Sequence, residues 1–315
     1  MARVQTVIAV MRAEPKAFAD ASDALTRWAA RVAGLFALEL LAIWLMGSIA
    51  TWRGGDALLQ ASSVIGALVL LVAWRSLRAS PGSAWAPWRG ALLFAANWLI
   101  FPLFKAIRMA WIDYTVDAPL LALDRALWGG LSLPEHAIAL ERVGLSEVFS
   151  AGYFAFYFVV LIPVIWFAYK HARREAQVFF LGLHLMYLLG FAGYVLMPAG
   201  GPYMAFPDVF PYPVQGRTIT RFLTGLVAQG TTGMDVFPSL HSGVTVYIWG
   251  FCLLGGRRYR AAAVTLTPML LCIVVATVYL RYHYGIDLLA GIALALGVLW
   301  IVQSFRKREG ACPCP

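Results

Sequence analysis

Eight long blocks of apolar residues follow one another along the chain, and the segments between them hold most of the charged residues. A helix needs roughly 20 predominantly apolar residues to cross a bilayer, where it satisfies its own backbone hydrogen bonds. The sequence therefore predicts an all-α, polytopic transmembrane bundle of about eight spans. The blocks cover about residues 32–52, 57–74, 86–104, 148–169, 178–198, 239–256, 261–281 and 285–304.

The composition agrees with a membrane protein. Of 315 residues, 61% are hydrophobic and 13% are charged, about half the charged fraction of soluble domains. The net charge of +9 comes from short basic clusters between apolar blocks, not from a basic domain, so we expect no nucleic-acid partner. Two cysteines lie inside apolar blocks and two in the C-terminal tail (Cys312 and Cys314), which gives no disulfide framework.

The distribution of Lys and Arg predicts the orientation of the bundle. With the N-terminus in the cytoplasm and eight crossings, 17 of the 25 basic residues fall inside and eight fall outside. Each short inside connection then carries three of them. We therefore expect both termini in the cytoplasm, in a multi-pass protein of the bacterial inner membrane or an equivalent membrane.

The blocks and loops suggest four parts. Residues 1–31 lack an uninterrupted apolar core and are expected to form a cytoplasmic extension, with no signal peptide. Residues 32–84 hold two accessory transmembrane helices, residues 85–305 form the catalytic membrane domain, and residues 306–315 form a cytoplasmic tail. Two long outer segments, near 105–147 and 199–238, have a length typical of functional or disordered loops. The first should contain a short helix along the interface at Pro119–Gly130.

Three groups of polar residues fall on the same predicted outer face. Phe237–Gly243 opens the sixth block, Tyr279–Asp287 joins the seventh to the eighth, and Lys105 and Arg108 follow the third. Ionisable groups at a membrane boundary are costly unless they have partners or a function. Their convergence predicts a site at the non-cytoplasmic rim of the bundle.

The spacing of these residues permits phosphoryl-transfer chemistry. His283 and Asp287 are four residues apart and share a helical face, so the carboxylate can hold one ring nitrogen protonated and leave the other as a nucleophile or base. His241 lies in the first turn of a helix, where the dipole favours an anion, with Ser239 as its N-cap. Positive charge for a phosphate would come from Lys105, Arg108 and Arg281.

Plainer interpretations compete for several of these residues. We interpret His136, His171 and His184 as packing or hydrogen-bonded histidines without a catalytic role. Lys105 and Arg108 could instead anchor lipid head groups, and Arg281 could anchor a helix end. Arg217 and Arg221 are expected to serve the outer loop.

Two of the motifs resemble a known family. Pro238-Ser-Leu-His241 and Arg281-x-His283-x3-Asp287-x2-Ala-Gly291 resemble the second and third signature motifs of the type-2 phosphatidic acid phosphatase superfamily. Phe-Pro-Ser-Leu-His-Ser-Gly and Tyr-Leu-Arg-Tyr-His-Tyr resemble the branch that includes inositol phosphorylceramide synthases, as do the segment at Asp124 and the Pro198–Pro202 loop. The resemblance spans about residues 95–304.

The resemblance implies a mechanism within a six-helix core. His283 would attack phosphorus to form a phosphohistidine, Asp287 would orient it, and His241 would protonate the leaving oxygen. Water or a second alcohol would then release the phosphoryl group. Neither a metal nor another cofactor is implied. The substrate would be a lipid phosphate or phospholipid.

The chain also departs from the family. Members often have Gly where Leu240 stands, and an Arg where Thr277 stands. The first signature motif is only loosely represented by Lys105 and Arg108, and the first two blocks lie outside the shared core.

Three functions remain open on the sequence alone. The protein could be a metal-independent phosphatase that hydrolyses a lipid phosphate, or a transferase that moves a phosphate-bearing head group to an alcohol, as inositol phosphorylceramide synthases do. It could also be a lipid transporter or binder without catalysis.

Overall fold

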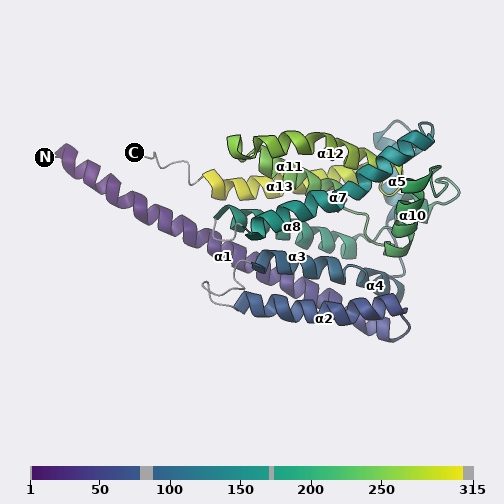
Figure 1. Ribbon diagram of the computed structural model, residues 1–315, viewed down its shortest axis with the longest axis horizontal. Helices are drawn as coiled ribbons and strands as arrows, with labels where there is room; N and C mark the ends of the chain where they lie inside the picture. The colour runs from purple at the N-terminus through teal and green to yellow at the C-terminus, as the bar shows by residue number, and fades with distance from the viewer. Residues whose placement is uncertain (1, 79–87, 170–173, 308–315) are drawn as a thin grey trace.

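The computed structural model describes the backbone of residues 2–78, 88–169 and 174–307, and the side chains in these ranges between residues 24 and 306. All of the regular structure in these ranges is helical, and the long helices run side by side in one bundle (Figure 1). The predicted all-α polytopic membrane fold is confirmed.

Each predicted span corresponds to a helix or a broken pair of helices. Six helices are long and apolar enough to cross a membrane, and the pair α3–α4 gives a seventh crossing if it counts as one. The eighth is the shorter apolar helix α11. In chain order the segments are α1 (Ala2–Trp52), α2 (Ala57–Arg78), α3 (Arg89–Ile100) with α4 (Leu103–Trp111), α7 (Val143–Tyr169), α8 (Arg174–Leu196), α11 (Leu240–Leu253), α12 (Arg260–Tyr279) and α13 (Gly285–Lys307).

The third span is broken at Phe101 and Pro102. The two halves meet at an angle of 49°. Proline has no N–H and its ring clashes with the carbonyl four residues earlier, which favours a break in the helix at Pro102. Both residues at the break line the central cavity described below.

Helix α11 has only 14 residues, which gives it a length of about 21 Å. This is shorter than the roughly 30 Å of a hydrocarbon core. Its neighbours α12 and α13 are longer, and both pack against it. The start of α11 is therefore surrounded by the bundle.

The loops and short helices gather at one end of the bundle, and the start of α1 and the end of α13 lie at the other (Figure 1). The interfacial helix expected at Pro119–Gly130 is present as α5 (Asp117–Leu127). The other short helices are α6 (Leu133–Ile138), α9 (Pro202–Ala205) and α10 (Thr218–Gly230). A 3-10 turn, η2 (Gly256–Tyr259), precedes α12.

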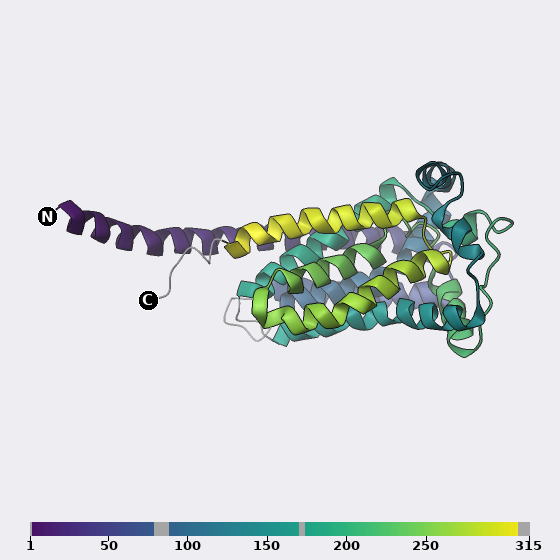
Figure 2. The ribbon, with the colours of Figure 1, turned by 90° about the horizontal axis from the view of Figure 1, so that it is seen from above.

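The first two helices pack against the side of the bundle. Helix α1 contacts α8, α4 and α2, while α2 packs on α3. Helix α1 is continuous across residue 31, where the sequence suggested a boundary, and its first part extends beyond the other helices (Figure 2). The Cys312 and Cys314 tail lies outside the described residues.

Candidate active site

The two histidine motifs meet where α11 crosses α13. A Cβ atom on Gly243 would lie 2.8 Å from the carbonyl oxygen of Gly291, and one on Gly291 would overlap the carbonyl oxygen of Ser239. Only glycine at both positions lets the two backbones come this close. The backbone N–H of Ser239 also donates to the carbonyl oxygen of Asp287 (3.0 Å). The crossing thus fixes the start of α11 beside the start of α13.

His241 lies in the first turn of α11, and Ser239 is the N-cap, as predicted: its hydroxyl accepts from the backbone N–H of Ser242 (3.3 Å). The imidazole stacks on the ring of Tyr153, with centroids 4.6 Å apart, and packs against Phe156 at 4.5 Å. Its Nδ1 atom is buried without a hydrogen-bond partner. The ring is therefore held by aromatic contacts, and this nitrogen stays available for a ligand.

His283 lies in the turn between α12 and α13, opposite His241. The two ring centroids are 5.7 Å apart. Nδ1 of His283 lies 3.5 Å from Oδ2 of Asp287, an oxygen that also accepts from the backbone N–H of Tyr284 at 2.8 Å. Such a spacing is long for a strong hydrogen bond, but catalytic contacts often tighten only when substrate binds. Asp287 thus lies on the Nδ1 side of the ring, and the backbone of Val236 also forms a hydrogen bond with the imidazole.

The environment of His283 keeps its imidazole neutral. Burial lowers the pKa of His283 from 6.5 to about 4, and the negative charge of Asp235 opposes this only in part. A neutral imidazole carries the lone pair that a nucleophile needs. The imidazole of His283 is therefore neutral at neutral pH.

Asp117 on α5 holds the turn that carries His283. Its carboxylate accepts from the backbone N–H groups of Gly200 and Gly201, both at 2.9 Å, and from the hydroxyl of Tyr284 at 3.1 Å. Gly201 has a φ of +85°, and a Cβ there would overlap the carbonyl oxygen of Tyr282. The Pro198–Pro202 loop is thus fastened to both sides of His283.

Asp124 lies two turns further along the same face of α5 and holds the other side of the turn that carries His283. It accepts from the backbone N–H groups of Ile286 (2.8 Å) and Leu133 (3.0 Å) and from the indole of Trp128 (3.1 Å). The sequence analysis assigned no role to either aspartate. The sequence does contain a pattern that could have identified them. Four residues have the i, i+3, i+4, i+7 spacing of a buried helical face: Asp117, Leu120, Leu121 and Asp124. Carboxylates on a buried face need hydrogen-bond partners, so the two acids of this set are candidates for a structural role.

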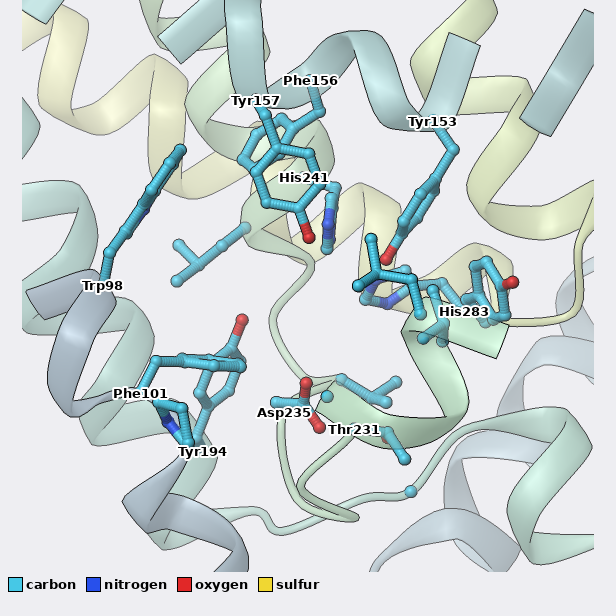
Figure 3. Close-up of a pocket in the computed structure, with 18 of the residues that line it drawn as sticks. Trp98, Phe101, Tyr153, Phe156, Tyr157, Tyr194, Thr231, Asp235, His241 and His283 are labelled. Carbon is cyan, nitrogen blue, oxygen red and sulfur yellow. The ribbon is translucent and has the colours of Figure 1, made fainter. Parts of the chain in front are cut away.

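Both histidines open into a cavity of about 440 Å³. Eight aromatic side chains from α3, α7 and α8 line it, together with Phe101 and Pro102 at the break in the third span. Figure 3 shows His241 and His283 facing this space, with the carboxylate of Asp235 on the loop that leads into α11. Asp235 was not among the residues expected from the sequence.

The cations expected to bind phosphate lie elsewhere. Arg281, only 2% exposed and at a φ of 66°, forms an ion pair with Glu141 and donates to the carbonyl oxygen of Pro211. Arg108 donates to the carbonyl oxygen of Ile112, and neither it nor Lys105 lines the cavity. A buried guanidinium needs a carboxylate partner, which explains why Arg281 turns to Glu141. In the described structure these three residues are not in contact with His241 or His283.

Two departures from the family pattern are explained by packing. The side chain of Leu240 fills the space beside Gly190, where a Cβ would lie 2.5 Å from a Leu240 methyl carbon. Its backbone N–H donates to the hydroxyl of Tyr194. Thr277 is buried, and its carbonyl oxygen accepts from the backbone N–H groups of Tyr282 (3.0 Å) and His283 (3.1 Å).

A membrane bundle with two facing histidines and a supporting aspartate agrees with the comparison to known families. A profile described as the PAP2 superfamily matches residues 118–301, more than half of the chain. The protein therefore belongs to the PAP2 superfamily.

Among individual proteins, the chain is similar to the phosphoinositol dihydroceramide synthase of Bacteroides thetaiotaomicron. The two are 26% identical over 214 residues, which cover 61% of this chain and 69% of the relative. No solved structure matches the chain significantly.

Proposed function

We propose that the protein transfers a phosphate-bearing head group from a phospholipid to an alcohol through a phosphohistidine intermediate. The observation that carries this proposal is the pair of imidazoles in one cavity, with ring centroids 5.7 Å apart and the Asp287 carboxylate behind His283. A phosphorus atom between the rings could contact a nucleophile on one side and an acid on the other. Membership of the PAP2 superfamily supports phosphoric-ester chemistry.

In the first step, Nε2 of His283 uses its lone pair to attack phosphorus. The bond between phosphorus and the oxygen of the lipid alcohol breaks, and His241, as an imidazolium, gives its proton to that oxygen. Asp287 stabilises the positive charge that develops on His283. The products are a diacylglycerol-type alcohol and a head-group phosphate bonded to His283.

In the second step, the acceptor resolves the intermediate. Its hydroxyl proton passes to His241, its oxygen bonds to phosphorus, and the bond between phosphorus and His283 breaks. Both histidines return to their starting protonation states, so the cycle is balanced. The backbone N–H groups at the start of α11, with the helix dipole, favour the phosphate charge throughout.

The choice between an alcohol and water as acceptor defines the alternative function, a lipid-phosphate phosphatase. The aromatic walls of the cavity favour a second lipid alcohol over bulk water, and the relative's name, phosphoinositol dihydroceramide synthase, supports transfer. His241 lies at the start of α11, whereas Arg257 and Arg258 follow the end of that helix and Arg306 lies at the end of α13. By the positive-inside rule this arrangement favours a substrate at the non-cytoplasmic face.

The test is a product analysis with purified protein in lipid nanodiscs. Phospholipids with different head groups are incubated with and without long-chain alcohols and ceramides, and new lipids are measured by mass spectrometry beside free phosphate. We expect a new head-group ester that requires both donor and acceptor. Free phosphate without a new ester would favour the phosphatase. A His283→Ala protein that is fully active would exclude the phosphohistidine route.

A further inference from the structure

Asn97 is the only asparagine of the chain, and it lies on α3 one turn before the break at Phe101. Its side chain is 0% exposed and lines the central cavity. Both polar atoms of the amide, Oδ1 and Nδ2, are buried without a hydrogen-bond partner among the described residues. An unpaired buried amide is costly in free energy, which indicates that a bound ligand supplies its partner.

The cavity wall around Asn97 is rich in hydrogen-bond donors. Helices α3, α7 and α8 contribute five further polar side chains to the lining, and all of them are tyrosine or tryptophan: Trp98, Tyr153, Tyr157, Tyr187 and Tyr194. The indole of Trp98 donates to the hydroxyl of Tyr187 (3.3 Å), and this hydroxyl keeps its own proton for another acceptor. Such a wall complements a ligand that offers hydrogen-bond acceptors.

The acceptor that meets this wall carries no charge. Among the described residues that line the cavity, none is Lys or Arg, so a phosphate oxygen buried beside Asn97 would lack a cation, which is costly. Figure 3 shows Trp98 and Phe101 across the space from His283. In a phospholipid, only the glycerol carbons separate the phosphate from the uncharged carbonyl oxygens of the acyl esters. A phosphate held at the histidines therefore extends its ester groups toward the wall that contains Asn97.

We propose that Asn97 is a specificity-determining residue that donates a hydrogen bond from Nδ2 to an ester carbonyl oxygen of the donor phospholipid. The protein then selects ester-linked over ether-linked lipids, because an ether linkage has no carbonyl group and leaves the amide unpaired. This inference rests on the proposed function, because it concerns the lipid whose phosphate reacts at His283.

The first test compares two donors with the same head group. Turnover is measured with dioleoyl phosphatidylinositol, chosen because the relative's name includes phosphoinositol, and with its dioleyl ether analogue, which differs only in lacking the carbonyl groups. We expect the wild-type protein to favour the ester by at least about fivefold in kcat/KM. Asn97→Leu should remove this preference, because leucine has a similar size and no donor.

A matched control removes a buried hydrogen bond elsewhere in the bundle. The hydroxyl of Ser63 on α2 donates to that of Ser48 on α1 (2.7 Å), and neither residue lines the cavity. Ser63→Ala should leave the preference for the ester within about twofold of the wild-type value. A wild-type protein without a preference, or an Asn97→Leu protein that keeps it, would overturn the proposal.

Thermal unfolding of the protein in detergent, without phospholipid, shows whether Asn97 serves the ligand or the fold. Replacing an unpaired buried amide with an apolar side chain of similar shape is neutral or stabilising. Asn97→Leu should therefore unfold at the same temperature as the wild-type protein or at a higher one. A marked loss of stability, or equal losses of activity on both lipids, would refute the proposal, because the amide would then support the bundle.

A spectroscopic measurement separates this inference from the proposed function. Dioleoyl phosphatidylinositol with isotope-labelled ester carbonyls is bound to His283→Ala protein and to His283→Ala/Asn97→Leu protein, and the carbonyl stretching band is recorded by infrared difference spectroscopy. A hydrogen bond weakens the carbonyl bond, so we expect a band at lower frequency that the second substitution removes. Identical bands would contradict the role of Asn97. Failure of the catalytic proposal would show instead as full activity of the His283→Ala protein, whatever the spectrum.

Discussion

The carbonyl oxygen of Ser239 occupies the space that a Cβ atom on Gly291 would need. This contact lies at the crossing of α11 and α13, close to the residues that bring His241 and His283 together. The smallest possible side chain at position 291 is therefore a condition for the geometry of the candidate site.

Substituting Gly291 with alanine should push the two helices apart. We expect a loss of about 1–3 kcal/mol of stability, as for other overpacked cores, and a larger proportional loss of activity because the two imidazoles separate. The measurements are thermal unfolding and turnover in detergent. Gly297→Ala is the matched control on the same helix, since a Cβ there meets nothing within 4 Å. Equal behaviour of the two variants would contradict this account of the crossing.

Loss of the catalytic groups should abolish turnover without unfolding the protein. We expect His283→Ala and Asp287→Asn each to lower kcat by at least about 1000-fold, since triads of this kind act as a unit. A radiolabelled head group should be trapped on the wild-type protein in an acid-labile form and be absent from His283→Ala. His136→Ala is the control, because His136 is exposed and its ring forms a hydrogen bond with the Trp128 carbonyl oxygen, away from His241 and His283. Labelling of His283→Ala would refute the assignment of the nucleophile.

The activity should depend on pH through both histidines. The reactive form of His283 is the neutral imidazole, and burial lowers its pKa to about 4. Lowering the pKa extends the neutral form to more acidic solution, so kcat/KM should hold down to about pH 5 and fall below it. The basic limb belongs to kcat: His241 holds the proton that it donates beside the negatively charged phosphate of the bound substrate, and kcat should fall as that proton is lost. A loss of activity on the acid side centred at pH 6.5 or above would contradict this assignment of His283. A flat pH profile, measured with chemistry rate-limiting, would contradict it as well.

Asp117 should be required for the stability of the catalytic turn. Asp117→Ala leaves two buried backbone N–H groups and the Tyr284 hydroxyl without their acceptor, which should cost at least about 2 kcal/mol. Unfolding in denaturant measures the loss. Asp113→Ala removes an exposed acid from the same outer segment and should have little effect. A similarly small effect of Asp117→Ala would show that the loop is held by other contacts.

Chelators should leave the reaction unaffected. The proposed steps use His241, His283 and Asp287 as nucleophile, acid and base, and no step needs a metal ion. Activity measured after dialysis against EDTA should equal that of untreated protein. Full loss of activity that Mg²⁺ restores would favour a metal-dependent mechanism instead.

The sequence predicts the membrane helices well because the bilayer imposes their length and apolarity. Pro102 in the sequence favours a break in the third span. The angle between α3 and α4 depends on tertiary packing. Of the short helices α5, α6, α9 and α10, only α5 was expected. Segments at the membrane interface have a mixed composition, and neither length nor periodicity distinguishes them from loops.

Some features of the candidate site follow from local sequence spacing, and others depend on the tertiary fold. The i, i+4 spacing of His283 and Asp287 predicts their proximity, and the structure brings His241 to them. Arg281 lies two residues from His283, but adjacency in sequence does not fix side-chain direction: its backbone has a positive φ, and its partner Glu141 comes 140 residues earlier in the chain. Asp235 belongs to no sequence motif, because its position beside the cavity depends on how the loop before α11 folds into the bundle.

The fit of Leu240 beside Gly190 links two positions that are fifty residues apart in sequence. Enlarging residue 190 would press on the leucine that precedes His241, while shrinking residue 240 would leave a void there. Which residues are tolerated at position 190 therefore depends on the residue at position 240, and the reverse also holds. Relatives with glycine in place of Leu240 are free to carry a bulkier residue opposite it, and the two alignment columns should covary across the superfamily.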